Sequence, residues 1–425
     1  MSRFFWKYGL LFSVGTGIVA VITDKRNKYM NQNQLHKWNA TAAYAMLQIA
    51  NWSFYAVILA FSSNVLRDRG FTDGQISIFL GIATAASFIA QLGIGELISR
   101  SERIRTWAVM LLLGGVMAAS SLAAALPGLP NGMAVGAFGI SCMVLQLLPA
   151  LTNGIGMDAI RRGSPTNYSL ARGMGSLGYS SAAYAVGVMV RKYSSTVIPV
   201  AGAVCGIGFA VAVVWYHFAG EAGLAPSARE RGTEQKQGNF LRKYPRFALF
   251  LLAAVILQIS HNLPSNFMFQ IMLDKNGTAE HQGIATAICA LVELPVMFGF
   301  PWMLRRLKCD RWVRIGSVCM VLKGLLIFFA DSPEGVYLAQ MTQMVGYGLY
   351  VMSSVNYAEL VVDKGESVRA QSYLGATTTV GSLIASSIGG LICQHFGVQT
   401  MVLVCVVTAL IGGVIIACIA QKTEK

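Results

Sequence analysis

The chain has 425 residues, of which 55% are hydrophobic and only 12% are charged, and its mean hydropathy is +0.56. Soluble globular domains carry about twice this charged fraction, so the composition excludes an ordinary soluble protein and indicates an integral membrane protein. The apolar runs are long rather than alternating, which predicts membrane-spanning helices. The net charge of +14 could by itself suggest nucleic-acid binding, but the positions of the charges argue against it.

The first 40 residues differ from the rest of the chain, and we expect them to form a leader outside the fold. The sequence MSRFFWK precedes an apolar run, Tyr8–Ile22, that is short for a membrane span, and TDKRNK follows without a small-residue cleavage site. This pattern is typical of a signal-like or an interfacial segment. Met30 is an alternative start of the protein, in which case the residues before it would not exist in the cell.

Twelve apolar stretches follow, of a length suited to crossing a bilayer as helices. The one long polar segment, Ala219–Arg246, comes after the sixth stretch and has the composition of a solvated linker. We therefore divide the chain into a first six-helix bundle (41–217), a linker (218–246), a second six-helix bundle (247–420) and a tail (421–425). The predicted spans are Thr41–Leu66, Ile76–Ser99, Thr106–Leu126, Met133–Met157, Leu170–Val190, Val197–His217, Phe247–Leu273, Ile284–Leu304, Ile315–Ala330, Val336–Val361, Ala370–Ile392 and Thr400–Ala420.

The two halves resemble each other in places. The fifth span contains RGMGSLGYSSAAYAVG and the eleventh contains QSYLGATTTVGSLIASSIGG, which share a Gly- and Ser-rich composition at equivalent positions. Parallel repeats of this kind are related by an axis along the membrane normal, with the binding site between them near the bilayer midplane. We therefore expect an all-α membrane protein with twelve transmembrane helices in two pseudo-symmetric six-helix bundles.

The basic residues predict the orientation of the bundle. Most of them lie in one set of loops, which includes RSERIR, DAIRRG, the linker and RRLKCDRW. By the positive-inside rule this set is cytoplasmic, and an even number of spans then places both ends of the bundle in the cytoplasm of a cell inner (plasma) membrane. The surplus positive charge is thus explained by topology, and no basic patch interleaved with aromatic residues indicates nucleic-acid binding. The opposite set of loops holds only Arg67, Arg69, Arg191, Lys192 and Lys275.

The fifth span carries an arginine in an otherwise apolar and small-residue helix. Arg172 and Tyr179 are seven positions apart, so they lie on one face, separated by roughly 10 Å along the axis. An ionisable group inside a membrane helix usually faces a partner or a water-filled cavity, which indicates the wall of a polar cavity. Equally, Arg172 could extend to the membrane interface, because it lies near the helix end.

Two further charges lie within predicted spans. Glu293 is mid-span, two residues before Pro295, where an ionised carboxylate costs several kcal/mol unless it is paired or hydrated. It is a candidate either to accept hydrogen bonds from substrate hydroxyl groups or to take up a proton that couples transport to a gradient. The alternative is a structural ion pair with Lys323 on the next helix, for which Lys323 is better suited than for binding a ligand.

Uncharged polar and aromatic side chains on the spans could complete the cavity. Each of them alone is more often a contact between helices than a ligand. His261 is a candidate proton carrier, although a lone histidine near Pro264 is more often simply hydrogen-bonded. Pro264, Pro295 and Pro301 are expected to kink or loosen spans seven and eight. The candidates are Asn51, Trp52 and Tyr55 on span one, His261, Asn262 and Asn266 on span seven, and Gln340, Gln343 and Asn356 on span ten.

The sequence lacks motifs for catalysis or cofactor binding. It contains no Walker loop, no HExxH and no GxSxG sequence. The eight cysteines fall mostly in apolar runs, and none forms a CxxC metal-ligand spacing. The sequence therefore predicts neither an enzyme nor a metal or cofactor site, and transport would draw on an ion gradient or on the gradient of the substrate itself.

Over Thr41–Ala420 the layout resembles the major facilitator superfamily. Several stretches are similar to the branch that contains lactose permease, nucleoside:proton symporters and phenylpropionate permeases. The resemblance implies the major facilitator fold and secondary transport by alternating access. The similar stretches are NWSFYAVILAFSSNVLRDRGFTDGQIS, IAQLGIGELISR, VELPVMF and RAQSYLG with IGGLICQHFG.

The resemblance also implies roles for individual residues. Arg172 and Tyr179 match an arginine and an aromatic residue that contact sugar in lactose permease, and Glu293 of VELP matches an eighth-helix carboxylate that helps to hold it. Lys323 falls near a ninth-helix basic position tied to proton coupling, and Gln343 near a tenth-helix histidine. The tenth-helix glutamate that serves proton release in lactose permease has no equivalent here, which leaves proton coupling by that scheme open.

The sequence as a whole predicts proton-coupled symport of a small polar solute, such as a sugar, an oligosaccharide or a nucleoside. The expected partners are this solute, protons and the lipid bilayer, with no nucleic acid, and a monomer is plausible. Alternatives are a carrier of aromatic or other organic acids, in which Arg172 would bind a carboxylate bidentately, drug efflux on the same fold, and a non-transporting membrane receptor. The predicted substrate-binding residues are Arg172, Tyr179, Glu293, Asn51, Tyr55, His261, Asn266 and Gln343, and the predicted proton-coupling residues are Glu293, Lys323 and His261.

Overall fold

A computed structural model of the chain describes residues 32–100, 104–220, 240–363 and 366–422. Residues 1–31 of the predicted leader (1–40), most of the predicted linker (221–239) and the last three residues of the predicted tail lie outside the described residues. The rest of the predicted leader is helical, because α2 begins at Gln32. Throughout its described part the chain is helical and contains no strand. The prediction of an all-α protein is confirmed.

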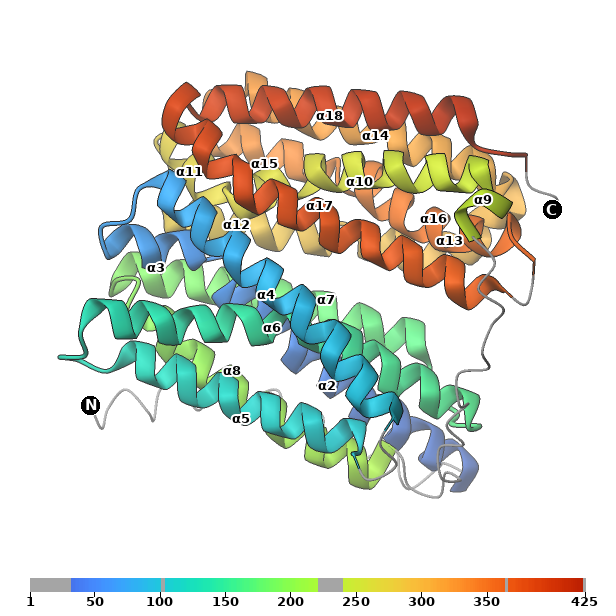
Figure 1. Cartoon of the computed structure of the whole chain (residues 1–425), viewed down its shortest axis with the longest axis horizontal. Coiled ribbons are helices and arrows are strands. Elements are labelled where there is room, and N and C mark those ends of the chain that lie inside the picture. The colour runs from blue at the N-terminus through green and yellow to red at the C-terminus, as the bar shows by residue number, and fades with distance from the viewer. Residues whose placement is uncertain (1–31, 101–103, 221–239, 364–365, 423–425) are drawn as a thin grey trace.

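The first half of the chain forms one helical bundle, drawn in blue to green in Figure 1. Within it, α2 packs most extensively on α7, and α5 packs on both α8 and α6. The elements are α2 (Gln32–Ile58), α3 (Ser62–Asp68), α4 (Asp73–Arg100), α5 (Thr106–Ala125), α6 (Asn131–Arg161), α7 (Tyr168–Lys192), α8 (Val197–Trp215) and the π-helix η1 (Tyr216–Gly220).

The second half forms another bundle, drawn in yellow to red. Here α18 packs on α14 and α10, and α17 packs on α10. The elements are α9 (Phe240–Lys243), α10 (Pro245–Asn266), α11 (Met268–Asp274), α12 (Ala279–Leu291), α13 (Leu294–Arg306), α14 (Cys309–Phe329), α15 (Pro333–Met341), the π-helix η2 (Met344–Gly348), α16 (Leu349–Leu360), α17 (Ser367–Phe396) and α18 (Val398–Ile419).

Ten helical segments among the described residues are long and apolar enough to cross a membrane. The two predicted spans that do not reach this apolarity correspond to α7 and to the α15–η2–α16 segment. Both are rich in Gly, Ser, Tyr or Gln, and they include Arg172 and Gln343. Two of the predicted site residues, Arg172 and Gln343, thus lie on the two predicted spans that are less apolar than the others.

Several passages are interrupted where the sequence predicts continuous spans. The eighth span breaks between α12 and α13, around Val292 and Glu293. Pro295 in the first turn of α13 explains this break, because proline lacks an N–H group and disfavours a helical residue before it. In the seventh span, α10 ends at Asn266, two residues after Pro264. Pro301, in contrast, lies inside α13 and does not end that helix. Loosening near Pro264 and Pro295 is therefore observed, and a break at Pro301 is not.

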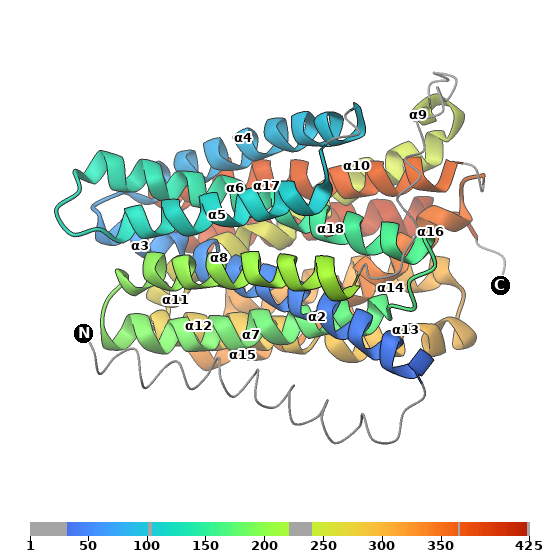
Figure 2. The ribbon, with the colours of Figure 1, turned by 90° about the horizontal axis from the view of Figure 1, so that it is seen from below.

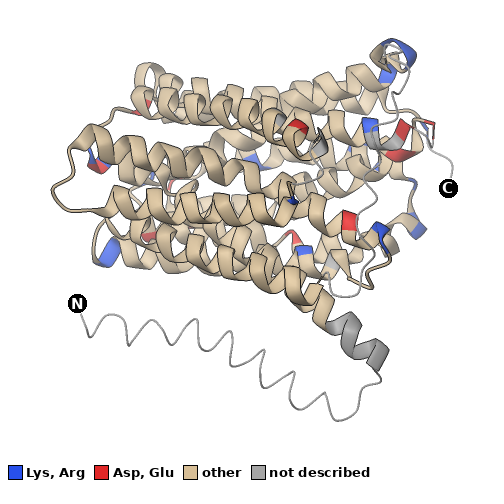
Figure 3. Cartoon of the chain, turned by 60° about the horizontal axis from the view of Figure 1, so that its bottom comes forward, with Lys and Arg blue, Asp and Glu red and all other residues tan. Residues whose placement is uncertain are grey.

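The two ends of the molecule carry different turns. We call the end that holds α9 and the turns at residues 307–308 and 361–366 the linker end, and the end with the turns at residues 69–72, 193–196, 275–278 and 397 the far end. Figure 2 shows the helices of both bundles running between these ends. Figure 3 shows that most described Lys and Arg residues lie at the linker end, where the C-terminus is marked.

The hydrogen bonds that the structure describes between the two bundles are concentrated at the far end, where α4 packs against α17 (Figure 1). The amide of Gly390 donates to Ser77 Oγ at 3.1 Å, and the Ser77 hydroxyl donates to the Ser386 carbonyl. A Cβ atom at position 390 would lie 2.0 Å from the Asp73 carbonyl oxygen, so only glycine permits this approach. Further bonds join Gly74 with Gln394, Gln270 with Asp73, Gln282 with the Ala60 carbonyl, and Arg191 with Glu280.

Candidate functional site

A stripe of aromatic and amide side chains runs along one face of α2. Tyr44, Gln48 and Trp52 follow one another at intervals of four residues, so their side chains lie above one another on the helix. Trp52 Nε1 donates to Gln48 Oε1 at 3.0 Å, and Gln48 Nε2 donates to the Tyr44 hydroxyl at 2.8 Å and to Asn153 Oδ1 at 3.1 Å. This chain of hydrogen bonds fixes the indole ring of Trp52.

Arg172 of α7 lies against the face of that ring. Its Cζ atom is 4.2 Å from the centroid of Trp52, a cation–π geometry. Gly175 makes the approach possible, because a Cβ atom there would lie 2.6 Å from Cδ1 of Trp52. Arg172 therefore points into the protein toward α2, and the alternative in which it extends to the membrane interface does not describe this structure.

Tyr55 and Tyr179 extend this aromatic surface toward the centre of the molecule. The ring centroids of Trp52 and Tyr55 are 5.5 Å apart, and those of Trp52 and Tyr179 are 6.5 Å apart. All three rings are partly exposed although their helices are packed in the bundle. We call Trp52, Tyr55, Arg172 and Tyr179 the aromatic wall.

A chain of three polar side chains faces it from the second bundle. Lys323 Nζ of α14 donates to Gln343 Oε1 at 2.8 Å, and Gln343 Nε2 donates to Glu293 Oε1 at 2.8 Å. Lys323 also lies 3.7 Å from Cys289 Sγ. Gln343 and Lys323 are buried, whereas Glu293 is partly exposed. Gln343 thus bridges Glu293 and Lys323, for which the sequence had suggested a direct ion pair. We call Lys323, Gln343 and Glu293 the Glu293 chain.

Helix interruptions position two members of this chain. Glu293 is the residue immediately before α13, and Gln343 lies between α15 and the π-helix η2. At such interruptions the backbone does not follow the regular α-helical hydrogen-bond pattern. Turns of π-helix are frequent at functional sites. The same arrangement of discontinuous helices near a binding site is common in secondary transporters.

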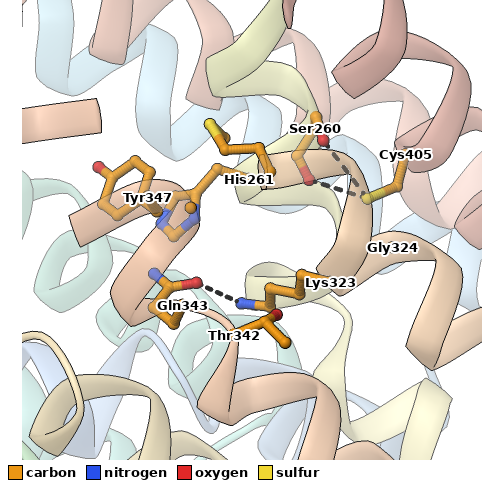
Figure 4. A pocket seen from close by; sticks show the side chains of 10 residues that line it. Ser260, His261, Lys323, Gly324, Thr342, Gln343, Tyr347 and Cys405 are labelled. Carbon is orange, nitrogen blue, oxygen red and sulfur yellow. Dashed lines mark hydrogen bonds between the residues drawn. The ribbon is translucent and has the colours of Figure 1, made fainter. Parts of the chain in front are cut away.

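A small cavity adjoins the Glu293 chain (Figure 4). It lies beside Lys323 and Gln343 and has room for about one water molecule. On its other side the rings of His261 and Tyr347 are stacked, with centroids 3.5 Å apart and an interplanar angle of 4°. His261 is therefore held against Tyr347 of η2 beside Lys323.

The aromatic wall and the Glu293 chain are close enough to interact across the two bundles. Both Arg172 and Lys323 lie within electrostatic reach of the Glu293 carboxylate. The helix that carries Tyr179, α7, packs against α12 and α13, the two helices on either side of Glu293. The structure thus brings together most of the residues predicted from the sequence, namely Arg172, Tyr179, Tyr55, Glu293, Gln343, Lys323 and His261.

Asn51 and Asn266 lie apart from this group in their observed contacts. Asn51 is fully buried on α2, and its side-chain amide has no hydrogen-bond partner among the residues that the structure describes. Asn266 donates to Ser386 Oγ at 2.9 Å, and its carbonyl oxygen accepts from Ser63 at 3.4 Å, so it belongs to the far-end contact between the bundles. A substrate role for either residue stays a prediction.

Sequence reasoning missed several participants. Gln48 and Asn153 hold Trp52 in place, and the spacing of four residues from Tyr44 to Gln48 and Trp52 was the available signal. Tyr347 was not predicted either, because its position depends on the π-helical turn of η2. The flanking glycines, Gly346 and Gly348, are the only feature of the sequence near Tyr347 that could have drawn attention to it.

The match to a known protein family covers nearly the whole chain. The model of the MFS_1 like family matches residues 16–423. The chain belongs to this family. Solved structures similar to it include those of the nucleoside transporter NupG, in one case a point mutant, with a TM-score of 0.73, 14% identity and coverage of 90% of this chain and 100% of that one. The unmutated NupG gives a TM-score of 0.71 at 15% identity, over 90% of this chain and 98% of that one.

Two further relatives of this member of the MFS_1 like family are described as transporters or as homologues of one. A structure of a bacterial homologue of the iron transporter ferroportin in an inward-facing state has a TM-score of 0.67 and 14% identity over 92% of this chain and 100% of that one. A curated protein of Deinococcus radiodurans, described as "Putative sugar efflux transporter", is 24% identical over 164 residues. This match spans 38% of the present chain and only 41% of that protein.

These findings confirm the predicted fold and the resemblance to the major facilitator superfamily. Ten helices among the described residues are long and apolar enough to cross a membrane, and the relatives found are transporters rather than enzymes. The similarity to solved structures shows the fold alone, since the identities are 14 to 15%. The transported substrate therefore has to be inferred from the chemistry of the site.

Proposed function

We propose that this member of the MFS_1 like family is a proton-coupled symporter of a small, uncharged, hydroxyl-rich solute, such as a sugar, an oligosaccharide or a nucleoside. The observation that supports it most is the placement of the Glu293 chain opposite Arg172 on the aromatic wall. A titratable carboxylate, two cations and three aromatic rings are thus gathered between two helical bundles. The description of the Deinococcus radiodurans relative and the likeness to NupG are compatible with this class of solute.

The aromatic wall suits a sugar or nucleoside ring. Trp52, Tyr55 and Tyr179 offer apolar ring faces together with polar edges, which favour amphipathic rings over fully apolar or fully charged solutes. The guanidinium of Arg172 keeps its N–H donors in the plane of the group while its face lies on Trp52. Substrate hydroxyl oxygens can therefore accept from Arg172 without displacing it.

The Glu293 chain provides the means to couple a proton to this binding. As a carboxylate, Glu293 accepts from Gln343 and attracts Arg172 across the interface between the bundles. When it takes up a proton, the attraction to Arg172 weakens and the carboxyl group gains a donor for a substrate oxygen. Protonation and substrate binding therefore favour each other, as symport requires.

The charge distribution supports an inward orientation of the linker end. Most described Lys and Arg residues lie there (Figure 3), so we place that end in the cytoplasm of the inner (plasma) membrane. The far end would then face outward, closed by the contacts of α4 with α17. The structure would correspond to a state closed toward the outside.

A carrier of organic acids is the second candidate. Arg172 and Lys323 are two cations near one centre, and a substrate carboxylate could pair with Arg172. The Glu293 carboxylate beside both of them disfavours this candidate, because it already supplies the negative charge that the cations attract. Binding of acids would be expected only when Glu293 is protonated.

The test is uptake by proteoliposomes that contain the purified protein, with a panel of sugars, nucleosides and aromatic acids. We expect a sugar or nucleoside to accumulate against its gradient when the vesicles carry an inward proton gradient, and accumulation to stop with a proton ionophore. In Glu293→Gln, which keeps the shape of the side chain, accumulation should be lost while exchange of substrate across the membrane persists. Glu359→Gln, an exposed carboxylate of α16, is the control and should behave as the wild type. Accumulation of acids alone, or full accumulation in Glu293→Gln, would contradict the proposal.

A further inference from the structure

The exposed side of α13 carries aromatic side chains that lead to a positive charge at the linker end. Phe298, Trp302 and Arg306 follow one another at intervals of four residues, so they lie on one face of the helix. Phe298 is 49% exposed and Trp302 is 59% exposed, whereas Val296 and Phe300 pack into the second bundle from the opposite face. We call Phe298 and Trp302 the apolar stripe. Cζ of Arg306 lies 5.1 Å from the ring centroid of Trp302, a cation–π geometry that holds the guanidinium at the end of this stripe.

Four exposed cations gather within seven residues where α13 meets α14. Arg305 and Arg306 lie in the last turn of α13, Lys308 lies in the connection, and Arg311 lies in the first turn of α14. None of the four forms an ion pair with a carboxylate in the part of the chain that the structure describes. We call these four residues the basic turn.

The acid nearest in sequence does not neutralise the basic turn. The side chain of Asp310 is only 4% exposed and lies 3.7 Å from Arg314, so its charge is used inside the bundle. Other basic residues of the linker end have their own carboxylates, since Arg162 lies 2.8 Å from Asp158 and Lys243 pairs with two acids. Membrane topology explains why positive charge collects at this end. It does not explain why this group has no counter-ion, and an external anion would supply one.

The apolar stripe lies at the boundary between the two bundles. A Cβ atom on Gly173 of α7 would overlap the ring of Phe298, so this ring lies directly on the backbone of the first bundle. Contacts between α7 and α13 continue this boundary along the two helices. A long apolar chain lying on the stripe would therefore follow the line where the bundles meet.

We infer that this surface binds an anionic phospholipid, with its phosphate on the basic turn and an acyl chain along the apolar stripe. Arginine pairs bidentately with phosphate oxygens, and clustered cations beside a membrane helix attract acidic lipids. Tryptophan is typical of the level where headgroups meet hydrocarbon. A free phosphate ion would leave the apolar stripe uncovered, and a zwitterionic lipid brings no net charge to the basic turn. The inference goes beyond the proposed function and does not depend on the identity of the transported solute.

The experiment measures, by native mass spectrometry, the lipids bound to the full-length protein in a nonionic detergent. The probes are phosphatidylglycerol and phosphatidylcholine with the same acyl chains, and we expect phosphatidylglycerol to bind at least about tenfold more tightly. The double variant Arg305→Gln with Arg306→Gln should weaken its binding by about twentyfold, since each cation contributes roughly a fivefold attraction. The matched control, Arg242→Gln with Arg246→Gln, removes the same charge from two exposed positions at the same end and should leave binding unchanged.

A second variant tests the apolar half of the surface. Trp302→Ala should weaken phosphatidylglycerol binding by about fivefold and leave any binding of glycerol phosphate, which has no acyl chain, unchanged. All substituted side chains are exposed, so the melting temperature should stay at the wild-type value in each variant.

Three results would overturn the inference. Equal binding of the two phospholipids would remove the role of charge, and equal weakening by the two double variants would show attraction to the linker end in general. Full displacement of phosphatidylglycerol by an equal concentration of glycerol phosphate would show a site for free anions rather than for a lipid. Each of these results leaves the proposed function in place, because no substituted residue belongs to the aromatic wall or to the Glu293 chain.

Discussion

The two walls of the candidate site are built in different ways. The aromatic wall stands on α2 and α7, which are unbroken at Trp52 and Arg172 and packed closely through Gly175. Two members of the Glu293 chain, Glu293 and Gln343, stand on the interrupted passages α12–α13 and α15–η2–α16, while Lys323 stands on the continuous α14. Rigid neighbouring helices suit a fixed platform for a ring, whereas helix breaks allow side chains to rearrange when a charge changes. We therefore propose that the first bundle chiefly recognises the substrate and that the second couples the proton.

The largest expected effect comes from removing the cation of the aromatic wall. Arg172→Ala should weaken substrate binding by about a hundredfold, because it removes both hydrogen-bond donors and the group stacked on Trp52. Equilibrium binding to the purified protein measures this, with Arg305→Ala at the exposed end of α13 as the control. If binding is unchanged and the variant is folded, recognition does not depend on this wall.

A smaller effect should follow from disturbing the packing beneath the wall. Gly175→Ala places a Cβ atom 2.6 Å from Trp52 Cδ1, so the indole must move away from Arg172. We expect about tenfold weaker binding. In the double variant with Trp52→Phe, which offers a smaller ring, the loss of binding free energy should be less than the sum of the losses in the two single variants. Simple additivity would show that the two positions act independently.

The contact at the far end tests whether the bundles move relative to each other. Gly390→Ala would bring a Cβ atom within 2.0 Å of the Asp73 carbonyl, so α17 and α4 must separate. In a variant that retains Cys393 as its sole cysteine, labelling of this buried thiol from the outside should become severalfold faster. Gly375→Ala on the same helix meets no atom and is the control. Unchanged labelling would mean that this contact does not hold the far end closed.

The smallest effect is expected at the linker end, where α9 is tied to the α16–α17 turn. Lys243 Nζ lies 2.8 Å from Asp363 and 2.7 Å from Glu366, and the Tyr244 hydroxyl bonds to both carboxylates. Hydrogen bonds from Lys243 and then from Tyr244 hold the pKa of Asp363 and the pKa of Glu366 below their ordinary values of 3.8 and 4.5. The lowered pKa values mean that these bonds stabilise the structure above the ordinary pKa values and are lost as the pH falls through the lowered ones.

A spin label at Leu241→Cys reports on this tie. Its mobility should be low at neutral pH and rise on acidification below about pH 4. In Lys243→Met it should already be higher at neutral pH and change little on acidification. Because the groups are exposed, the effect on overall stability should be small. Identical acid profiles in the two proteins would exclude the ion pairs as the cause.

The sequence predicted much of the fold and part of the site. Long apolar runs and the central polar segment indicated the helices, because hydropathy over twenty residues is a strong signal. Arg172 and Glu293 stood out because buried charge is rare in membrane helices. Pro295 had indicated the break beside Glu293. The break at Gln343, the bridging by Gln343 and the stack of His261 on Tyr347 were not predictable, since each depends on how separate helices pack. The span boundaries also differ, for example at α14, which begins at Cys309 rather than near Ile315.

The central claim is that substrate binding and proton uptake are coupled at Glu293. The most direct test measures proton uptake when substrate binds. The purified protein in weakly buffered detergent solution is mixed with saturating substrate while a pH indicator is recorded. We predict that the wild type takes up protons when substrate binds and that Glu293→Gln binds substrate without taking up any. Equal proton uptake by the two proteins would contradict the account, because the proton would then be carried elsewhere.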